Sequence, residues 1–232
     1  YFVDIYDLLL FSIVRIPSLK SLGLSAEEVS SVGASIVQWQ MFGLLVGGII
    51  WGILGDKKGR LSVLFGSIIT YSLANIACGF VQDPTMYMAL RFIAGIGLAG
   101  ELGAGITLVS EILPKELRAI AASLVAGIGL LGAVVAYFSV ELFDWRTAYF
   151  MGGGLGLALL LLRVGVIESG MFKNISDQKH VTRGDFLSLF SNSNRLWRYL
   201  KCIGIGLPTW FAIGILLTFS NEIAQALGVS EE

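Results

Sequence analysis

The stretch Gly52-Ile-Leu-Gly55-Asp56-Lys-Lys-Gly59-Arg60 decides how the rest of this chain folds. It lies between two apolar runs, residues 33–53 and 61–81, each about 20 residues long, which is the length that a helix needs to cross the hydrocarbon of a bilayer. Glycines allow a tight turn and a close approach of helix ends, and basic side chains favour the cytoplasmic side of a membrane. The stretch therefore predicts a short cytoplasmic loop between two membrane helices, in which Asp56 and Arg60 can pair.

The composition is that of an integral membrane protein. Of the 232 residues, 55% are apolar and 14% are charged, whereas soluble domains contain about 25% charged residues. The mean hydropathy is +0.78, and the net charge of −1 gives no basic excess for binding nucleic acid. Cys78 and Cys202 lie in or beside apolar runs and form neither a disulfide framework nor a metal-ligand cluster. We therefore expect no metal site, no cofactor and no nucleic-acid partner.

Seven apolar segments predict an all-α membrane protein. The expected helices span residues 1–16, 35–54, 61–81, 85–112, 119–143, 146–167 and 197–220. Pro17 is expected to end the first helix, and Asp83-Pro84 is expected to form a tight turn before the fourth. Three regions follow from this pattern. They are a six-helix transmembrane bundle over residues 1–167, a cytoplasmic central loop over 168–196, and a seventh helix with the loop after it over 197–232.

The positions of Lys and Arg predict the topology. Most of these residues, from Lys57 to Lys201, fall on one side of the expected membrane, and only Lys20 and Arg146 clearly fall on the other side. Because basic loops stay in the cytoplasm, the N-terminus, the stretch around Asp56 and the central loop are expected to be cytoplasmic. We expect a multi-pass protein of the plasma membrane, the inner membrane in a bacterium.

A short internal echo suggests a chain built from two related halves. Ser21-Leu-Gly-Leu-Ser-Ala-Glu-Glu28, after the first expected helix, is matched 205 positions later by Ala226-Leu-Gly-Val-Ser-Glu-Glu232, after the seventh. Six helices followed by a restart is the pattern of a transporter made of two six-helix halves. We therefore expect this chain to be one half plus the first helix of the next, truncated before five further helices.

Ionisable side chains within the expected membrane helices are costly unless they face a cavity or a partner, and four of them are candidates for coupling. Asp4 and Asp7 are in the first helix, and Arg91 and Glu101 are in the fourth. With a rise of about 1.5 Å per residue, Arg91 can reach Asp7, while Asp4 and Glu101 fall at similar depth. A carboxylate binds a proton less readily beside an arginine than alone in a low dielectric. We therefore expect these four residues to couple proton flow to transport, with a Na⁺ site at Asp4 and Asp7 as an alternative.

Six further side chains carry polar or aromatic groups that could line a substrate cavity. They are Arg15, Gln38, Gln40, Asn75, Tyr137 and Trp210. The same residue types also serve helix packing and membrane interfaces, so each has a structural explanation as well. Arg15 and Arg91 would suit an anionic metabolite, unless Arg91 is already held by Asp7.

Several segments resemble motifs of the major facilitator superfamily of secondary transporters. The stretch from Gly52 to Arg60 is similar to the loop between its second and third helices, with the pattern G-x-x-x-D-x-x-G-R. Arg91-Phe-Ile-Ala-Gly-Ile-Gly-Leu-Ala-Gly100 resembles its fourth-helix motif, and Glu111-Ile-Leu-Pro-Lys-Glu-Leu-Arg118 resembles the segment that follows. Tyr6-Asp7 resembles the first helix of proton-coupled sugar porters, in which the Asp pairs with the helix 4 Arg. The resemblance covers the first six helices and is nearest to the metabolite–proton symporter and sugar porter branches.

The resemblance also implies a cytoplasmic gate, a charge network that closes the outward-open state. Carried over by motif position, its residues are Gly52, Asp56, Gly59, Arg60, Glu111, Arg118 and Glu168. Position 57 departs from the family, with Lys where Arg is frequent. The glycine–proline motif of drug/proton antiporters is missing from the fifth helix, where Gly127, Gly129 and Gly132 stand without a proline. This argues against antiport.

What the resemblance implies is a secondary active transporter that moves a small organic metabolite by alternating access, with proton symport as the form of coupling. A uniporter or antiporter of the same fold, and a membrane receptor or sensor that does not transport, remain alternatives. An enzyme is not expected, because the sequence shows no nucleophile–base pair, no metal-ligand cluster and no phosphate-binding loop. The expected partners are the small-molecule substrate and the lipid bilayer, and the protein is expected to work as a monomer once its second half is included.

Overall fold

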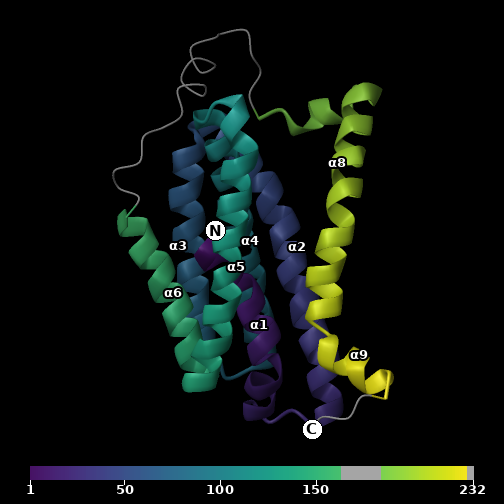
Figure 1. Cartoon of the computed structure of the whole chain (residues 1–232). Coiled ribbons are helices and arrows are strands. Elements are labelled where there is room, and N and C mark those ends of the chain that lie inside the picture. Colours follow the sequence, from purple (N-terminus) through teal and green to yellow (C-terminus); the bar gives the residue numbers. More distant parts are fainter. Residues whose placement is uncertain (163–183, 229–232) are drawn as a thin grey trace. The chain divides into compact units, whose positions relative to one another are not determined.

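The structure is a computed structural model that describes residues 1–162 and 184–228, and the regular elements in this part of the chain are helical. It divides into two compact units, Tyr1–Gly184 and Asp185–Glu232, each described by itself. The first unit is a helical bundle (Figure 1). Its helices are α1 (Phe2–Ser21), α2 (Ala26–Lys58), α3 (Arg60–Gly79), α4 (Pro84–Ile112), α5 (Lys115–Leu142) and α6 (Trp145–Leu162). The second unit contains η1 (Phe186–Leu189), α8 (Ser193–Phe211), the π-helical segment η2 (Ala212–Leu217) and α9 (Ser220–Ala226).

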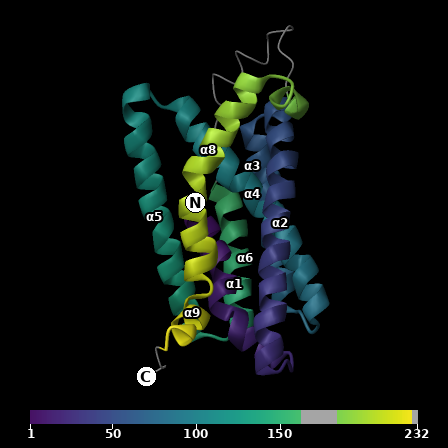
Figure 2. The same ribbon diagram turned by 90° about the vertical axis from the view of Figure 1, so that its right-hand side faces the viewer.

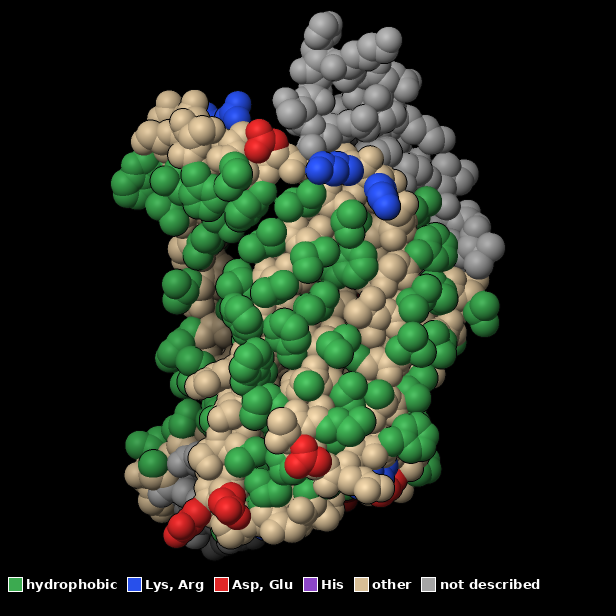
Figure 3. Space-filling model, turned by 180° about the vertical axis from the view of Figure 1, so that it is seen from behind, with side chains coloured by type: hydrophobic (Ala, Val, Ile, Leu, Met, Phe, Trp, Pro, Cys, Tyr) green, Lys and Arg blue, Asp and Glu red, His purple; other side chains and the backbone are tan. Residues whose placement is uncertain are grey.

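Six of the described helical segments are long and apolar enough to cross a membrane, five in the first unit and one over Ser193–Leu216. On the face shown in Figure 3, hydrophobic side chains cover the middle, and the charged side chains in view lie toward the two ends. A band of this kind matches the hydrocarbon layer of a bilayer. The prediction of an all-α membrane protein is confirmed.

Helix α1 differs from these six because it is charged along its length. Asp4, Asp7 and Arg15 are all buried, although α1 has only 20 residues. The helix packs against α2, α4, α5 and α6, and in Figure 2 it lies among the other helices of the bundle. Its neighbours therefore keep its charges away from lipid, which is how ionisable groups are tolerated at membrane depth.

The expected end of α1 and the expected start of α2 were both wrong. A glycine and a capping box set these two boundaries. Pro17 lies inside α1, which continues to Ser21, because the fixed φ of proline is itself helical even though one hydrogen bond is lost. The chain turns instead at Gly23, whose φ of 88° lies in the left-handed region that favours glycine. Ser25 and Glu28 then form a capping box, so that α2 begins at Ala26 and not at residue 35.

The expected loop at residues 52–60 was also wrong, because almost all of it is helical. Helix α2 continues to Lys58 and α3 begins at Arg60, so Gly59 alone makes the connection. Its φ of 96° requires a residue without a side chain. The break is so short that Asp56 and Arg60 lie within reach of each other across it.

The seventh expected helix, residues 197–220, is interrupted in the structure. Helix α8 contains Pro208 and ends at Phe211, the π-helical segment η2 follows, and α9 completes the run. Proline and π-bulges are recognised causes of such interruptions. After α9, Gly228 has a φ of 81°, close to that of Gly23 after α1. The two echoed sequences therefore share a helix-ending glycine as well as their letters.

Helix α6 lies close to α3 because Gly153 has no side chain. A Cβ at Gly153 would lie 2.5 Å from Ile76 Cγ1 and 2.8 Å from the Ser72 carbonyl oxygen, whereas a Cβ at the next residue, Gly154, would meet nothing within 4 Å. Small residues let helices approach closely in lipid, where packing is a main source of helix association. The two neighbouring glycines therefore have different structural roles.

Gly153→Ala should lower the melting temperature of the purified protein, because the added methyl group overlaps α3. Overpacking of this kind costs about 1–3 kcal/mol. Gly154→Ala is the matched control, and its new methyl group should change stability by no more than about 0.5 kcal/mol. Thermal unfolding in detergent measures both. Equal melting temperatures for the two variants would contradict the close approach of α6 to α3.

Candidate functional site

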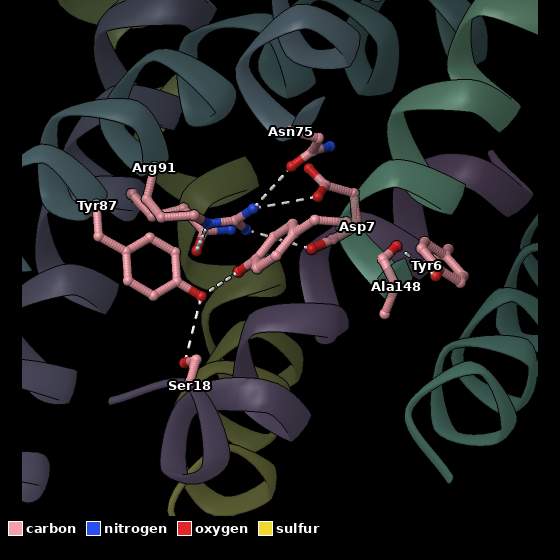
Figure 4. A network of polar contacts seen from close by, with 9 residues as sticks. Tyr6, Asp7, Ser18, Asn75, Tyr87, Arg91 and Ala148 are labelled. Carbon is pink, nitrogen blue, oxygen red and sulfur yellow. Dashed lines mark hydrogen bonds and ion pairs between the residues drawn. The ribbon is translucent and has the colours of Figure 1, made fainter. Parts of the chain in front are cut away.

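Arg91 of α4 lies at the centre of the bundle and is fully buried. Its Nη1 donates to Asp7 Oδ1 at 3.2 Å, and its Nη2 donates to the main-chain oxygen of Asp7 at 3.3 Å (Figure 4). The Asp7 side chain is 1% exposed. The contact between Asp7 and Arg91 expected from helix depth is therefore present. A buried charge pair of this kind persists only when further groups satisfy its remaining donors and acceptors.

Two amide side chains accept further hydrogen bonds from Arg91. Asn75 of α3 accepts from Arg91 Nη1 through Oδ1 at 3.0 Å, and Gln40 of α2 accepts from Arg91 Nε through Oε1 at 3.4 Å. Both amides are buried. Four helices, α1 to α4, thus meet at one guanidinium group, and two of the residues expected to line a substrate cavity accept hydrogen bonds from Arg91.

Aromatic side chains complete the surroundings of Arg91. Its guanidinium carbon lies 5.6 Å from the ring centroids of both Phe11 and Tyr149, a distance suited to cation–π attraction. The hydroxyl groups of Tyr149 and Tyr87 are 2.6 Å apart, and the Tyr87 hydroxyl donates to Ser18 Oγ at 3.5 Å (Figure 4). Helix α6 therefore also contributes to the site, through Tyr149.

Sequence reasoning missed these aromatic residues. Tyr87 stands four residues before Arg91, so the helical spacing could have placed it beside the arginine. Phe11 and Tyr149 give no such signal, because a buried ring on an apolar helix face is ordinary core. Only the packing of α1 and α6 against α4 identifies them.

The glycines that follow Arg91 explain why these helices converge. A Cβ at Gly95 would collide with the main-chain oxygen of Gln40 on α2. A Cβ at Gly97 would collide with Tyr71 on α3, one turn before the asparagine that accepts from Arg91. The spacing R-x-x-x-G-x-G therefore does two things at once. It supplies the buried cation and removes the side chains that would keep its partners away.

Asp4 and Glu101 lie at a second place in the bundle. Both are buried, and both line a cavity of about 210 Å³ bordered by α1, α3, α4 and α5. Asp4 Oδ2 lies 3.2 Å from the main-chain nitrogen of Tyr1. The expectation that the two carboxylates fall at similar depth agrees with this shared cavity.

Arg15, Gln38 and Tyr137, the remaining substrate candidates of the first unit, make no hydrogen bond with Arg91. Arg15 is buried further along α1, where its side chain packs against Gly33 of α2, so closely that a Cβ there would lie 2.7 Å from Arg15 Cδ. Gln38 is exposed. Tyr137 is 54% exposed on α5, and Trp210 is 48% exposed in the second unit. Within the first unit, the described residues therefore do not gather Arg15, Gln38 and Tyr137 into one cavity, and Trp210 belongs to the second unit, which is described by itself.

Some of the residues expected to form a gate contact one another in the structure. Arg60 Nη1 lies 2.9 Å from Asp56 Oδ1, and Arg60 Nη2 lies 3.5 Å from Glu111 Oε1. These contacts join α2, α3 and the end of α4. Arg118 Nε donates to the main-chain oxygen of Leu113 at 3.0 Å. The motif residues thus form a charge cluster at one end of the bundle, with Arg60 at its centre.

The glycines of the gate differ in role, and one gate residue lies outside the described part of the chain. Gly59 makes the turn, and a Cβ at Gly55 would lie 2.9 Å from Arg60 Nη1. Gly52 is exposed, and a Cβ there would meet nothing within 4 Å. Glu168 falls outside the residues that the structure describes.

Arg91→Met should strongly destabilise the purified protein, because it leaves the Asp7 carboxylate buried without its counter-charge. Breaking one side of a buried pair costs about 3–5 kcal/mol. Adding Asp7→Leu should recover part of the lost melting temperature, since the double variant has no buried charge at this point. If Arg91→Met alone were as stable as the double variant, the pair would not be desolvated as described.

Comparison with known proteins places these features in a family. The model of the Major Facilitator Superfamily matches residues 1–231. A putative metabolite transport protein of Haemophilus influenzae is 34% identical over 99% of this chain and 58% of its own length. The niacin transporter NiaP of Acinetobacter baylyi is 38% identical over 51% of this chain and 28% of its own length. The chain thus spans less than two thirds of these relatives.

Solved structures support the same fold. The inward-open xylose transporter XylE from E. coli matches with a TM-score of 0.62 and 17% identity, over 89% of this chain and 55% of that one. XylE bound to 6-bromo-6-deoxy-D-glucose, described as a proton:xylose symporter, matches with a TM-score of 0.64 and 18% identity, over 75% of this chain and 46% of that one. The resemblance noted in the sequence is confirmed, and this multi-pass membrane chain belongs to the major facilitator superfamily.

Proposed function

We propose that this chain is part of a secondary active transporter that carries a small organic metabolite by alternating access, together with a proton. The family supports transport. The observation that carries the coupling is the fully buried contact between Asp7 and Arg91. A proton-binding carboxylate that lies beside a fixed cation in a low dielectric changes its proton affinity sharply when the contact is lengthened.

The geometry suggests which atom takes up the proton. Asp7 Oδ1 faces Arg91, while Oδ2 is buried and has no hydrogen-bond partner among the described residues. In this proposal a proton binds at Oδ2 when rearrangement of the bundle weakens the contact, and leaves when the contact reforms. Asp4 and Glu101, which share a cavity, would serve as a second pair of carboxylates in the same coupling. Na⁺ in place of H⁺ is an outcome that transport measurements decide.

The substrate class we propose is a small organic acid. Relatives of this chain are named as transporters of niacin, gentisate and benzoate. Arg15 is a second buried cation on the same helix as Asp7, so the bundle holds a positive side chain besides the one that Asp7 contacts. Cationic side chains inside a membrane commonly mark the path of an anion.

The charge cluster around Arg60 fits a cytoplasmic gate. Lys57 and Lys58 adjoin it, and basic residues favour the cytoplasmic side. Two ion pairs, to Asp56 and Glu111, tie the ends of α2, α3 and α4 together. In the proposed cycle these pairs stabilise the state that is closed toward the cytoplasm and open to the outside, with the N-terminus cytoplasmic.

Asp7→Asn should abolish accumulation driven by a proton gradient while leaving substrate exchange intact. The experiment uses the full-length protein in proteoliposomes, with radiolabelled niacin, benzoate and gentisate and an inward proton gradient. Glu27→Gln is the control, because Glu27 is an exposed carboxylate in the first turn of α2. Flux that ignores the gradient in the unmodified protein would support a uniporter. The absence of flux for the whole panel would overturn the proposed substrate class.

Arg60→Gln should shift the transporter toward its inward-open state. The substitution removes two partly exposed ion pairs, each worth up to about 1 kcal/mol, so the equilibrium should move by roughly tenfold. Lys57→Gln is the matched control, since it removes an exposed neighbouring charge. Distances between spin labels on cytoplasmic helix ends of the full-length protein measure the two populations. An unchanged distribution in Arg60→Gln would remove the gate from the proposal.

A further inference from the structure

Gln40 and Asn75 reach the same guanidinium from different helices. Their side-chain oxygens accept from Arg91 at 3.4 Å and 3.0 Å, and both side chains are at least 98% buried. Glycines at the helix crossings allow these positions, as the steric limits at Gly95 and Gly97 show. The contacts therefore belong to the way α2 and α3 are packed on α4.

Among the described residues, each of the two amide side chains also leaves a buried donor group unpaired. The Gln40 Nε2 and Asn75 Nδ2 groups are buried and have no hydrogen-bond partner within the described part of the chain. A buried donor without a partner is unfavourable, and an apolar side chain of similar size would avoid it. Packing alone does not account for amides at these two positions. The oxygens that face Arg91 do.

Those oxygens matter most when Asp7 is neutral. A protonated Asp7 no longer offers Arg91 a counter-charge, although the arginine keeps its own charge at every accessible pH. The acceptors that remain do not titrate: the two amide oxygens and the main-chain oxygen of Asp7, at 3.3 Å. The rings of Phe11 and Tyr149 also face the guanidinium. The site can thus hold Arg91 in both charge states of Asp7.

We propose that Gln40 and Asn75 are positioning residues, whose side-chain oxygens hold the Arg91 guanidinium in place while Asp7 carries a proton. The inference rests on the proposed function, since it concerns the proton cycle of the same pair. Without these oxygens the protonated state contains a poorly solvated cation. A higher proton concentration is then needed to reach it.

The other titratable groups around the pair are few among the described residues. Cys78 of α3, Tyr87 of α4 and Tyr149 of α6 act electrostatically on Arg91, and Tyr6 of α1 lies within reach of Asp7. Thiols and phenols ordinarily ionise above about pH 8. A titration between about pH 4 and pH 8 at this place therefore reports a carboxylic acid.

The test is an infrared titration of the purified full-length transporter in lipid nanodiscs. The carbonyl stretching band of the protonated carboxylic acid is followed against pH, and Asp7→Asn identifies the band that belongs to Asp7. Gln40→Met and Asn75→Leu each remove one oxygen with little change in size. Each should require more protons for half-protonation, by up to about tenfold, because the lost oxygen contributes more to the stability of Arg91 when Asp7 is neutral than when it is charged. Asn75→Asp, which adds a carboxylate beside Arg91, should shift the titration in the opposite direction.

The controls lie on the same helices. Ser35→Ala on α2 and Thr70→Val on α3 remove hydroxyl groups that bond to their own helix backbone, and neither should move the titration. Because Gln40 and Asn75 are on different helices, a folding defect in one variant leaves the other as a test. An Asp7 band that titrates at the same pH in Gln40→Met, Asn75→Leu and the unmodified protein overturns this inference alone. If Asp7→Asn removes no band, Asp7 takes up no proton, and the proposed coupling fails together with the inference.

Discussion

The structure depends on the burial of the Arg91 guanidinium group inside a bundle of membrane helices. A cation at that depth is tolerated only where counter-charge and acceptors surround it. Arg91 finds them on α1, α2 and α3 and finds an aromatic ring on α6. These helices must therefore hold particular distances from α4. Few other groups in the described bundle impose so many constraints from a single side chain.

The glycines and the arginine of α4 together determine how α2 and α3 pack against it. Glycine at a crossing only permits close approach; it does not specify which residues meet. Arg91 specifies them, because it needs oxygens at hydrogen-bonding distance. Gly95 and Gly97 remove the steric obstacle where α2 and α3 cross. The short motif thus encodes both the attraction and the space for it, which explains how three residues of α4 can orient two neighbouring helices.

Much of the fold could be predicted from the sequence, because the signals were local or periodic. Apolar runs predicted the helices. The depths of Asp7 and Arg91 along their helices predicted a contact between them, and the structure contains this contact. The predicted helix ends were wrong where a single residue decided the boundary. Pro17 lies inside α1 and does not end it, and Gly59 alone connects α2 to α3 where a longer loop was expected. The rings around Arg91 were not predictable, since their role depends on tertiary packing. The roles of Asp7, Arg91, Asp4 and Glu101 in transport stay predictions.

The charged character of α1 has a consequence for how the protein enters the membrane. An Asp or Arg at the middle of an isolated helix opposes insertion by about 2.5–3.5 kcal/mol, and α1 carries Asp4, Asp7 and Arg15 within 20 residues. Arg91 lies 84 residues after Asp7, so during synthesis the counter-charge does not exist when α1 leaves the ribosome. Insertion of α1 alone is therefore less favourable than insertion together with α4. The pairing of Asp7 with Arg91 thus links the membrane insertion of the first helix to that of the fourth.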